Sequence, residues 1–394
     1  MSQRPLIVHL TYILDFGGLE TLIVESINRM PVDQYRHAIV CLTRFTDFRH
    51  RITRAGVEVI ALDKQPGIGL GTHVKLWRLL RQLKPTILHT YNLASAEYAF
   101  TAAMAGVPVR VHAEHGRDAG DPEGKNPKHR LLRRLLLPFI DSYVAVSADL
   151  EQWLKRDVGI PAAKVRFIDN GVDTARFCPA VGDAVGNTAA SAPFDIPASS
   201  FVIGTVGRIQ DVKNHAALVQ AFVELRAMLP GQRDQLRLVI VGAGPLLPRL
   251  QQQVAAAGIG HAVLLPGARD DIAAVMKTFS VFAMSSLAEG MPVTLLEAMS
   301  SGLPVVSTRV GGIPDLVDND TGALVPVGDP GAMAAALAIY AQDPALVRRH
   351  GATARERIIR KYSIDAMLAS YTALYDGLCK SKTTLKESSN PCAE

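Results

Sequence analysis

Short apolar runs alternate with longer amphipathic stretches along most of this 394-residue chain. The runs have the length of buried strands, and the stretches between them carry apolar residues at helical spacing. Such alternation is typical of a parallel sheet with crossover helices, in which ligands bind at the carboxyl ends of the strands. In the first half it predicts strands at 7–11, 38–42, 57–62, 86–90, 109–113 and 142–146, and helices at 19–30, 73–83, 95–105 and 128–139.

The alternation stops at a segment rich in Ala, Gly, Ser and Pro and then resumes. The strands predicted in the second half are 201–206, 238–241, 263–265, 280–283, 304–307 and 323–325. We therefore expect one Rossmann-like α/β domain at 1–178 and a second at 201–361. Between them we expect a linker or disordered insertion at 179–200, and after them a flexible tail at 380–394.

Composition narrows the class of protein without naming a function. With 48% hydrophobic and 20% charged residues, the chain is of the globular type. A net charge of +5 is too small to indicate nucleic acid binding. The four cysteines have no CxxC pairing, which fits a reducing cytoplasm and favours neither disulfides nor zinc. No apolar run reaches the 18 or so residues of a membrane span, so we expect a soluble or peripheral protein.

The stretch Ser285–Glu297 places two carboxylates around a predicted helix start. Pro292 suits the first helical turn, which does not need its missing N–H, and Gly290 leaves backbone amides open to an anion. Glu289 precedes those amides, and Glu297 lies about two turns into the helix. Because carboxylates repel phosphate, they would hold hydroxyl groups on either side of it, as in a sugar nucleotide. The spacing alone also fits a surface helix with a capping glutamate.

Four further segments follow predicted strands and bear polar or flexible residues. Arg208 and Lys213 place two cations near a helix amino terminus, where a bound anion would favour them, although a solvated loop is the alternative. Gly17 and Gly18 would let a ligand approach a helix start closely, or would simply form a βα turn. His112 and His115 lie at the end of the fifth predicted strand, as either core residues or polar groups in a cleft. The loop at Pro266–Asp271 is the last candidate.

Glu-x7-Glu with Gly-Met-Pro between, from Glu289 to Glu297, resembles the signature of the retaining glycosyltransferases of family 4. The resemblance implies the GT-B fold, in which two Rossmann-like domains face each other across a cleft. It extends over nearly the whole chain, and only the linker and the tail lie outside it. It also implies that a closing helix at 362–379 packs back on the first domain. Asp315 departs from the glutamate that is usual after the proline in Gly-Gly-Ile-Pro.

The resemblance assigns roles to the matching residues. Glu289 would contact hydroxyls of the donor sugar, and Glu297 the ribose of the nucleotide. Arg208 and Lys213 would bind the diphosphate and stabilise the charge on the leaving group in place of a metal. The sugar would also be contacted by His115, which completes the implied catalytic set. The implied donor-binding set further contains Gly17, Gly18, Arg269, Gly290, Met291, Pro292 and Val293.

Two other motifs are interpreted as structural. Gly242-Ala243-Gly244 lacks the third glycine of a dinucleotide motif, because Leu247 stands at that position, and this argues against a nicotinamide site. Asp318-Asn319-Asp320 resembles the Asp-x-Asp metal motif of another glycosyltransferase class, but its neighbours Thr321 and Gly322 favour a turn. We therefore expect neither a cofactor nor a bound metal.

The sequence as a whole predicts a metal-independent retaining transferase of hexosyl type. We expect it to move a sugar from a UDP- or GDP-linked donor to a hydroxyl of a glycan or polyprenyl-linked acceptor, in bacterial exopolysaccharide or cell-surface polysaccharide synthesis. Two alternatives stay open: a nucleotide-sugar epimerase on the same fold, and a sugar-nucleotide-binding protein without catalysis. Nucleic acid is not an expected partner.

Positive charge gathers at 125–139, where a helical wheel separates two arcs. One arc carries His129, Arg130, Arg133 and Arg134, and the other carries the leucines that would face the core. A core-packed helix with a solvated face is one interpretation. The other is that Arg130, Arg133 and Arg134 meet anionic lipid, which would place a cytoplasmic enzyme at the inner face of the plasma membrane.

Overall fold

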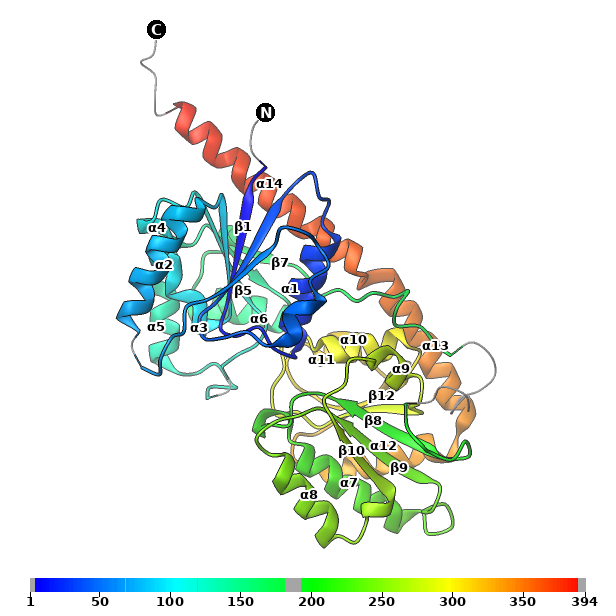
Figure 1. Cartoon of the computed structure of the whole chain (residues 1–394). Coiled ribbons are helices and arrows are strands. Elements are labelled where there is room, and N and C mark those ends of the chain that lie inside the picture. The colour runs from blue at the N-terminus through cyan, green and yellow to red at the C-terminus, as the bar shows by residue number, and fades with distance from the viewer. Residues whose placement is uncertain (1–3, 68, 119, 181–192, 389–394) are drawn as a thin grey trace. The chain divides into compact units, whose positions relative to one another are not determined.

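The computed structural model describes residues 4–67, 69–118, 120–180 and 193–388. Its contacts divide the chain into two compact units, Met1–Asp169 with Met367–Glu394, and Asn170–Ala366. Each unit contains one parallel sheet with helices on both faces (Figure 1), so the predicted α/β class is confirmed. Within the described residues no helix combines the length and the apolar character that a membrane crossing requires.

The first unit is built on a seven-stranded sheet of order β3-β2-β1-β4-β5-β6-β7. Its strands are β1 Leu6–Thr11, β2 Arg36–Cys41, β3 Glu58–Ala61, β4 Ile87–Tyr91, β5 Val109–Glu114, β6 Ser142–Ala145 and β7 Val165–Phe167. Its helices are α1 Gly18–Arg29, α2 Leu70–Leu83, α3 Leu93–Ala96, α4 Tyr98–Met104, α5 Pro127–Leu135 and α6 Ala148–Gln152. The central strands β1 and β4 are buried along their whole length, because helices cover both faces of a parallel sheet.

The second unit has a six-stranded sheet of order β10-β9-β8-β11-β12-β13. Its strands are β8 Phe201–Val206, β9 Leu236–Val241, β10 Val263–Gly267, β11 Val281–Met284, β12 Val305–Thr308 and β13 Gly322–Val325. Its helices are α7 His215–Met228, α8 Leu247–Ala256, α9 Ile272–Met276, α10 Val293–Ser300, α11 Ile313–Leu316, α12 Pro330–Gln342 and α13 Pro344–Lys361. Its core joins the apolar face of α7 to the sheet through Leu218, Phe222 and Leu225.

The boundaries between these parts differ in detail from those predicted. The second unit begins at Asn170, so the segment up to residue 178 belongs to it by contact. Residues 181–192 of the predicted linker lie outside the described residues, whereas its end is packed, with Phe194 and Ile196 buried. Helix α14, Ile364–Ser388, continues beyond Lys380, where the sequence predicts a tail.

Helix α14 carries the chain back to the first unit and is fixed there by side chains. Tyr375 OH lies 2.7 Å from Nδ1 of His89 on β4, and Tyr35 OH donates a hydrogen bond to Asp376. Farther along, Lys382 Nζ lies 2.7 Å from Asp141 Oδ1. That ion pair stabilises the helix beyond Lys380, in a segment whose polar composition predicts a flexible tail.

Candidate functional site

The second sheet changes winding direction between β8 and β11, which are neighbours in space but not in sequence. From such a pair the connections leave toward opposite faces, so the loops at the carboxyl ends diverge and leave room for a ligand. The loop after β8 holds Arg208 and Lys213, and the loop after β11 holds Glu289 and Gly290. The topology therefore brings together the two segments that the sequence analysis singled out separately.

Lys213 and Glu289 meet at this switch point, with Lys213 Nζ 2.5 Å from Glu289 Oε1. The same carboxylate oxygen accepts a hydrogen bond of 2.6 Å from Ser286 Oγ. The lysine and glutamate side chains are 21% and 10% exposed, so the pair is accessible at its edge. A phosphate approaching Lys213 would compete directly with the carboxylate, which makes this ion pair exchangeable with an anionic ligand.

The loop after β8 is also tied to the loop after β11 by hydrogen bonds to its backbone. Ser285 Oγ donates to the carbonyl oxygens of Lys213 and Asn214 at 3.1 and 2.8 Å, and Leu287 N donates to Val212 O at 2.8 Å. Asn214 adopts φ 48°, which turns the chain into α7. The lysine is thus held at the helix start by its own backbone.

Glycines hold both loops by allowing close backbone approach. A Cβ on Gly242 would lie 1.9 Å from Gly207 O, and one on Gly244 would lie 2.2 Å from Ile209 O. The Gly-x-Gly turn after β9 therefore supports the Arg208 loop, which agrees with its structural interpretation. On the other side, Gly311 has φ 52° and its Cβ would lie 1.8 Å from Glu289 O. Only glycine fits there, and it fixes the carbonyl of the acidic residue.

Helix α10 follows that loop, with Pro292 as its N-cap residue at φ −70°. Glu297 is buried within the helix at 8% exposure, and Met291 and Val293 are buried beside its start. Asn170 Nδ2 donates to Met291 O at 2.8 Å, and this bond anchors the loop before α10. Arg269, a member of the implied donor-binding set, makes a two-pronged ion pair with Asp271 at 2.7 and 2.6 Å.

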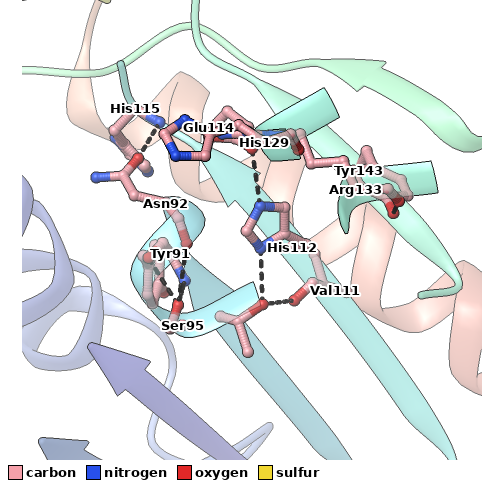
Figure 2. Close-up of polar contacts among 11 residues, drawn as sticks. Tyr91, Asn92, Ser95, Val111, His112, Glu114, His115, His129, Arg133 and Tyr143 are labelled. Atoms are coloured by element: carbon pink, nitrogen blue, oxygen red, sulfur yellow. Dashed lines mark hydrogen bonds and ion pairs between the residues drawn. The ribbon is translucent and has the colours of Figure 1, made fainter. Parts of the chain in front are cut away.

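The first unit has an equivalent switch point between β1 and β4. Gly17, the N-cap residue of α1, follows β1, and Gly18 is the first residue of that helix. After β4, Asn92 adopts φ 57° and ψ 170°, a region that residues with a Cβ seldom occupy. Its Oδ1 accepts the backbone N–H of His115 at 2.7 Å (Figure 2). Asn92 was not identified from the sequence, yet it ties the end of β4 to His115.

His115 follows β5 and is partly buried. Burial lowers its pKa to about 4, although the nearby Glu114 opposes that change. Its imidazole is therefore neutral near pH 7 and can donate or accept a hydrogen bond. Within the described residues its Nε2 atom has no hydrogen-bond partner. These properties suit a polar contact to a ligand.

The polar residues behind His115 form a buried network (Figure 2). His112 Nδ1 lies 2.9 Å from Thr90 Oγ1, and His112 Nε2 lies 3.1 Å from Glu114 Oε1. The same glutamate oxygen accepts a bond of 2.5 Å from Arg133 Nε on α5. His112 is therefore a hydrogen-bonded core residue, as one of its two interpretations proposed.

Arg133 contradicts the predicted arrangement of the basic stretch. Its side chain is 2% exposed, and its guanidinium lies over the ring of Trp153 at 4.7 Å. The assignment of Arg133 to a solvated or lipid-facing arc is wrong, because Glu114 supplies a buried partner that a helical wheel does not contain. As a result Leu131 and Leu135 point outward, at 54% and 62% exposure.

A second buried cluster links β1, β2 and β4 to α14. His9 Nδ1 lies 2.7 Å from Tyr91 OH, and His9 Nε2 lies 3.1 Å from His37 Nδ1. Burial lowers the pKa of His9 to about 3 and that of His37 to about 2. His89 joins the cluster through Tyr91 OH at 3.0 Å. These histidines are neutral at physiological pH and serve as hydrogen-bonding groups within the sheet.

Two doubly wound domains, with a cation and a carboxylate at the switch point of the second, define the GT-B class of proteins. The comparisons with known proteins agree with this class. The family described as Glycosyltransferase Family 4 matches residues 16–176, and the one described as Glycosyl transferases group 1 matches residues 200–343. The chain belongs to the family 4 glycosyltransferases, so the predicted family is confirmed.

Three similar proteins show how far the likeness extends. A D-inositol 3-phosphate glycosyltransferase of Geodermatophilus obscurus is 35% identical, covering 91% of this chain and 85% of its own. The UDP-Gal:alpha-D-GlcNAc-diphosphoundecaprenol alpha-1,3-galactosyltransferase of Escherichia coli is 26% identical over 94% of this chain and 96% of its own. The Anabaena protein HepE, solved with UDP and glucose, superimposes with a TM-score of 0.78 at 19% identity, covering 94% of this chain and 99% of its own.

Proposed function

We propose that the chain transfers a hexose, with retention, from a nucleoside diphosphate sugar to a hydroxyl of a glycan or polyprenyl-linked acceptor. The observation that carries the proposal is the contact of Lys213 with Glu289 at the switch point of the second sheet. A cation there suits a diphosphate, and an adjacent carboxylate suits sugar hydroxyls. A UDP-linked donor is the first choice, because the galactosyltransferase of E. coli is named for UDP-Gal and HepE was solved with UDP.

In the proposed mechanism, Arg208 and Lys213 hold the diphosphate, and no metal is needed to neutralise it. The bond from the anomeric carbon to the phosphate oxygen breaks, and the acceptor oxygen bonds to that carbon on the same face. The acceptor proton passes to the departing phosphate oxygen. Glu289 is proposed to position the sugar, and as the diphosphate takes Lys213, its carboxylate keeps the bond from Ser286.

The remaining predicted residues complete the proposed site. Glu297 is assigned to the ribose, and the Gly290–Val293 segment to the sugar and phosphate. Arg269 is assigned to the base, for which its guanidinium would have to leave or share Asp271. From the first unit, Gly17 and Gly18 are assigned to the donor phosphate and His115 to the sugar.

An epimerase needs acid and base groups beside the sugar ring in the first unit. The carboxylate next to His115 in the sequence is Glu114, which is buried and ion-paired with Arg133 at 2.5 Å. Burial by itself would raise the pKa of Glu114. The charge of Arg133 and the hydrogen bond with His112 outweigh that effect and lower the pKa to about 2. A carboxylate held ionised in this way is a poor proton donor, so Glu114 does not supply the acid group that an epimerase needs.

The proposed acceptor places the enzyme at the cytoplasmic side of a membrane, in the assembly of a cell-surface or extracellular polysaccharide. The relative from E. coli supports this, since its name specifies a diphosphoundecaprenol acceptor. Arg134 is exposed and Arg130 is partly exposed, although their guanidinium groups donate to the backbone carbonyls of Val158 and Gly124, whereas Arg133 is buried.

Release of nucleoside diphosphate tests the proposal. The purified chain is incubated with UDP-, GDP- and ADP-sugars, each with and without a polyprenyl-diphosphate-linked sugar, and both the diphosphate and the sugar nucleotide are measured. Release that depends on the acceptor, with an α-linked product from an α-linked donor, is expected. Conversion of the sugar without release would indicate an epimerase, and binding without either reaction would indicate a module that does not catalyse.

A further inference from the structure

Three neighbouring helices of the first unit expose large apolar side chains on one side of the sheet. In the part of the chain that the structure describes, seven of the sixteen exposed large apolar residues lie on α2, α4 and α5. Scattered single leucines on a surface are ordinary, but a concentration of this kind marks a contact surface. We name the following six residues the apolar strip: Val74, Trp77, Phe100, Met104, Leu131 and Leu135.

The three helices that carry the strip are joined by side-chain contacts or by a connecting turn. Trp77 Nε1 on α2 donates to Met104 O at the end of α4, at 3.3 Å. Phe100 on α4 meets Phe139 edge to face, with ring centroids 5.0 Å apart. Phe139 belongs to the turn of 3₁₀ helix, Leu137–Phe139, that directly follows α5. Helices α2, α4 and α5 accordingly lie on the same side of the first unit in Figure 1.

The exposure of Leu131 and Leu135 follows from how α5 is oriented. Arg133 turns inward to Glu114 and Trp153, and Leu136 is buried with it. Residues 131 and 135, one helical turn apart, are thereby directed outward together. The buried ion pair thus explains both why an arginine is missing from the surface and why two leucines are present on it.

Charge on the three helices has one sign. Helix α2 carries Lys75, Arg78 and Arg81, helix α5 carries Lys128, Arg130 and Arg134 besides the buried Arg133, and α4 carries no charged residue. None of the three contains Asp or Glu. By contrast, α1 contains Glu20 and Glu25, and α6 contains Asp149 and Glu151. Glu97, which precedes α4, borders the strip and lies 3.9 Å from His73 Nε2.

We propose that the apolar strip, with its cations, docks the first unit on an anionic lipid bilayer. Exposed apolar side chains enter the interface between headgroups and acyl chains, while lysine and arginine at the rim meet anionic headgroups. A second copy of this chain is disfavoured as the occupant, because the same cations would then face each other. The inference rests on the proposed membrane-linked acceptor and names the surface that would reach it, in place of the Arg130, Arg133 and Arg134 face.

Vesicle co-sedimentation tests the surface independently of the reaction. The full chain is mixed with phosphatidylcholine vesicles with and without phosphatidylglycerol, at low and high salt. Leu131→Ser with Leu135→Ser should reduce binding by about tenfold or more per leucine that inserts. Reversal of exposed cations by Arg78→Glu, Arg81→Glu and Lys128→Glu should reduce binding by about fivefold per residue, and only to the anionic vesicles.

Matched controls lie on the second unit. Ile339 and Ile359 are 57% and 50% exposed, so Ile339→Ser with Ile359→Ser removes similar apolar area elsewhere. Arg348→Glu with Arg360→Glu changes charge on α13. Both controls should bind anionic vesicles as the natural chain does. All variants should keep the same thermal midpoint and the same transfer rate to a short water-soluble acceptor, since none lies in the proposed site.

The possible results separate this inference from the proposed function. Loss of vesicle binding in the strip variants alone, with solution transfer retained, supports the strip. The inference is overturned if the natural chain does not bind anionic vesicles, or if controls and strip variants bind them equally. It is also overturned if the strip variants change only self-association, measured by sedimentation velocity. Absence of transfer to any acceptor by the natural chain would contradict the proposed function, whatever the vesicles show.

Discussion

Two ion pairs, one in each unit, show how the same chemistry can serve different purposes. Glu114 and Arg133 are 0% and 2% exposed, and the glutamate has a second bond, to His112, inside the first unit. Lys213 and Glu289 are 21% and 10% exposed and lie where loops diverge at the sheet switch point. A pair that water and ligands cannot reach fixes an element in place, whereas a pair at the edge of a loop can exchange partners.

The largest effect is expected from breaking the buried pair. Arg133→Met leaves Glu114 charged in a low-dielectric site, so the free energy of unfolding should fall by about 3–5 kcal/mol in urea titration. The double variant Arg133→Met with Glu114→Gln removes the uncompensated charge and should recover part of that loss. Lys128→Met on the exposed side of α5 is the control and should change stability by less than about 0.5 kcal/mol. Equal losses for Lys128→Met and Arg133→Met would contradict the burial of the pair.

The second pair should respond in the opposite way. Lys213→Ala removes a partly exposed ion pair of about 0–1 kcal/mol, so unfolding should hardly change. The kcat for transfer should fall by about 10²–10³, because a cation at the departing diphosphate is lost. Measuring diphosphate release and the thermal midpoint on the same preparation checks both parts. A variant that lost stability and kept its rate would make this pair structural, like the first.

Glu289→Ala sharpens the contrast within the second pair. If Glu289 positions the sugar, the kcat should fall more than the affinity for the nucleotide sugar, which titration calorimetry measures. Lys213 would then lose its carboxylate partner and gain freedom to hold the phosphate. Equal losses in turnover and donor affinity would mean that the glutamate contributes uniform binding only.

Acid should weaken the first unit through its buried histidines. The pKa values of His9, His37 and His115 are lowered by burial to about 3, 2 and 4, against 6.5 in the unfolded chain. Below pH 6.5 these histidines bind protons in the unfolded state but stay neutral in the folded state, so stability falls as the pH falls. The expected slope is about 1.4 kcal/mol per pH unit for each such histidine.

The window between pH 6.5 and 4.5 belongs to the histidines, because Glu114 contributes below that range. Its pKa is lowered to about 2, so the stability it provides is present above 4.5 and is lost as pH falls toward 2. His37→Asn should reduce the slope of unfolding free energy against pH in the upper window by one proton. An unchanged slope would show that His37 takes up its proton in the folded chain. In the second unit, burial lowers the pKa of His215 to about 4 and also lowers the pKa of His350, so both histidines act in the same direction there.

Sequence patterns predicted the strands well because each central strand is buried on both faces and reads as an apolar run. The strand β7 was missed, since three residues with Arg166 in the middle give no periodic signal. Loops after β8 and β11 were identified from charge and glycine, and the topology placed them side by side. How these residues contact a ligand stays a prediction.

The structural features that the sequence did not reveal depend on partners distant in the chain. Arg133 looks solvated on a helical wheel, and its burial follows from Glu114, nineteen positions earlier on a strand. Gly311 looks like an ordinary turn residue until Glu289 O is seen where its Cβ would be. Ser286 follows a strand, and a polar residue in that place was the signal that could have identified it.

Asn92 offers the smallest but most specific test, because it acts on His115 through one hydrogen bond. Asn92→Gly relieves the cost of φ 57° and removes the acceptor of the His115 N–H. Stability should therefore change little, while kcat/KM falls by about two- to tenfold, corresponding to about 0.5–1.5 kcal/mol for the lost bond. Asn92→Asp keeps an acceptor oxygen and should retain most of the activity. If the glycine variant were as active as the natural chain, the position of His115 would not depend on Asn92, and the histidine would be fixed by β5 alone.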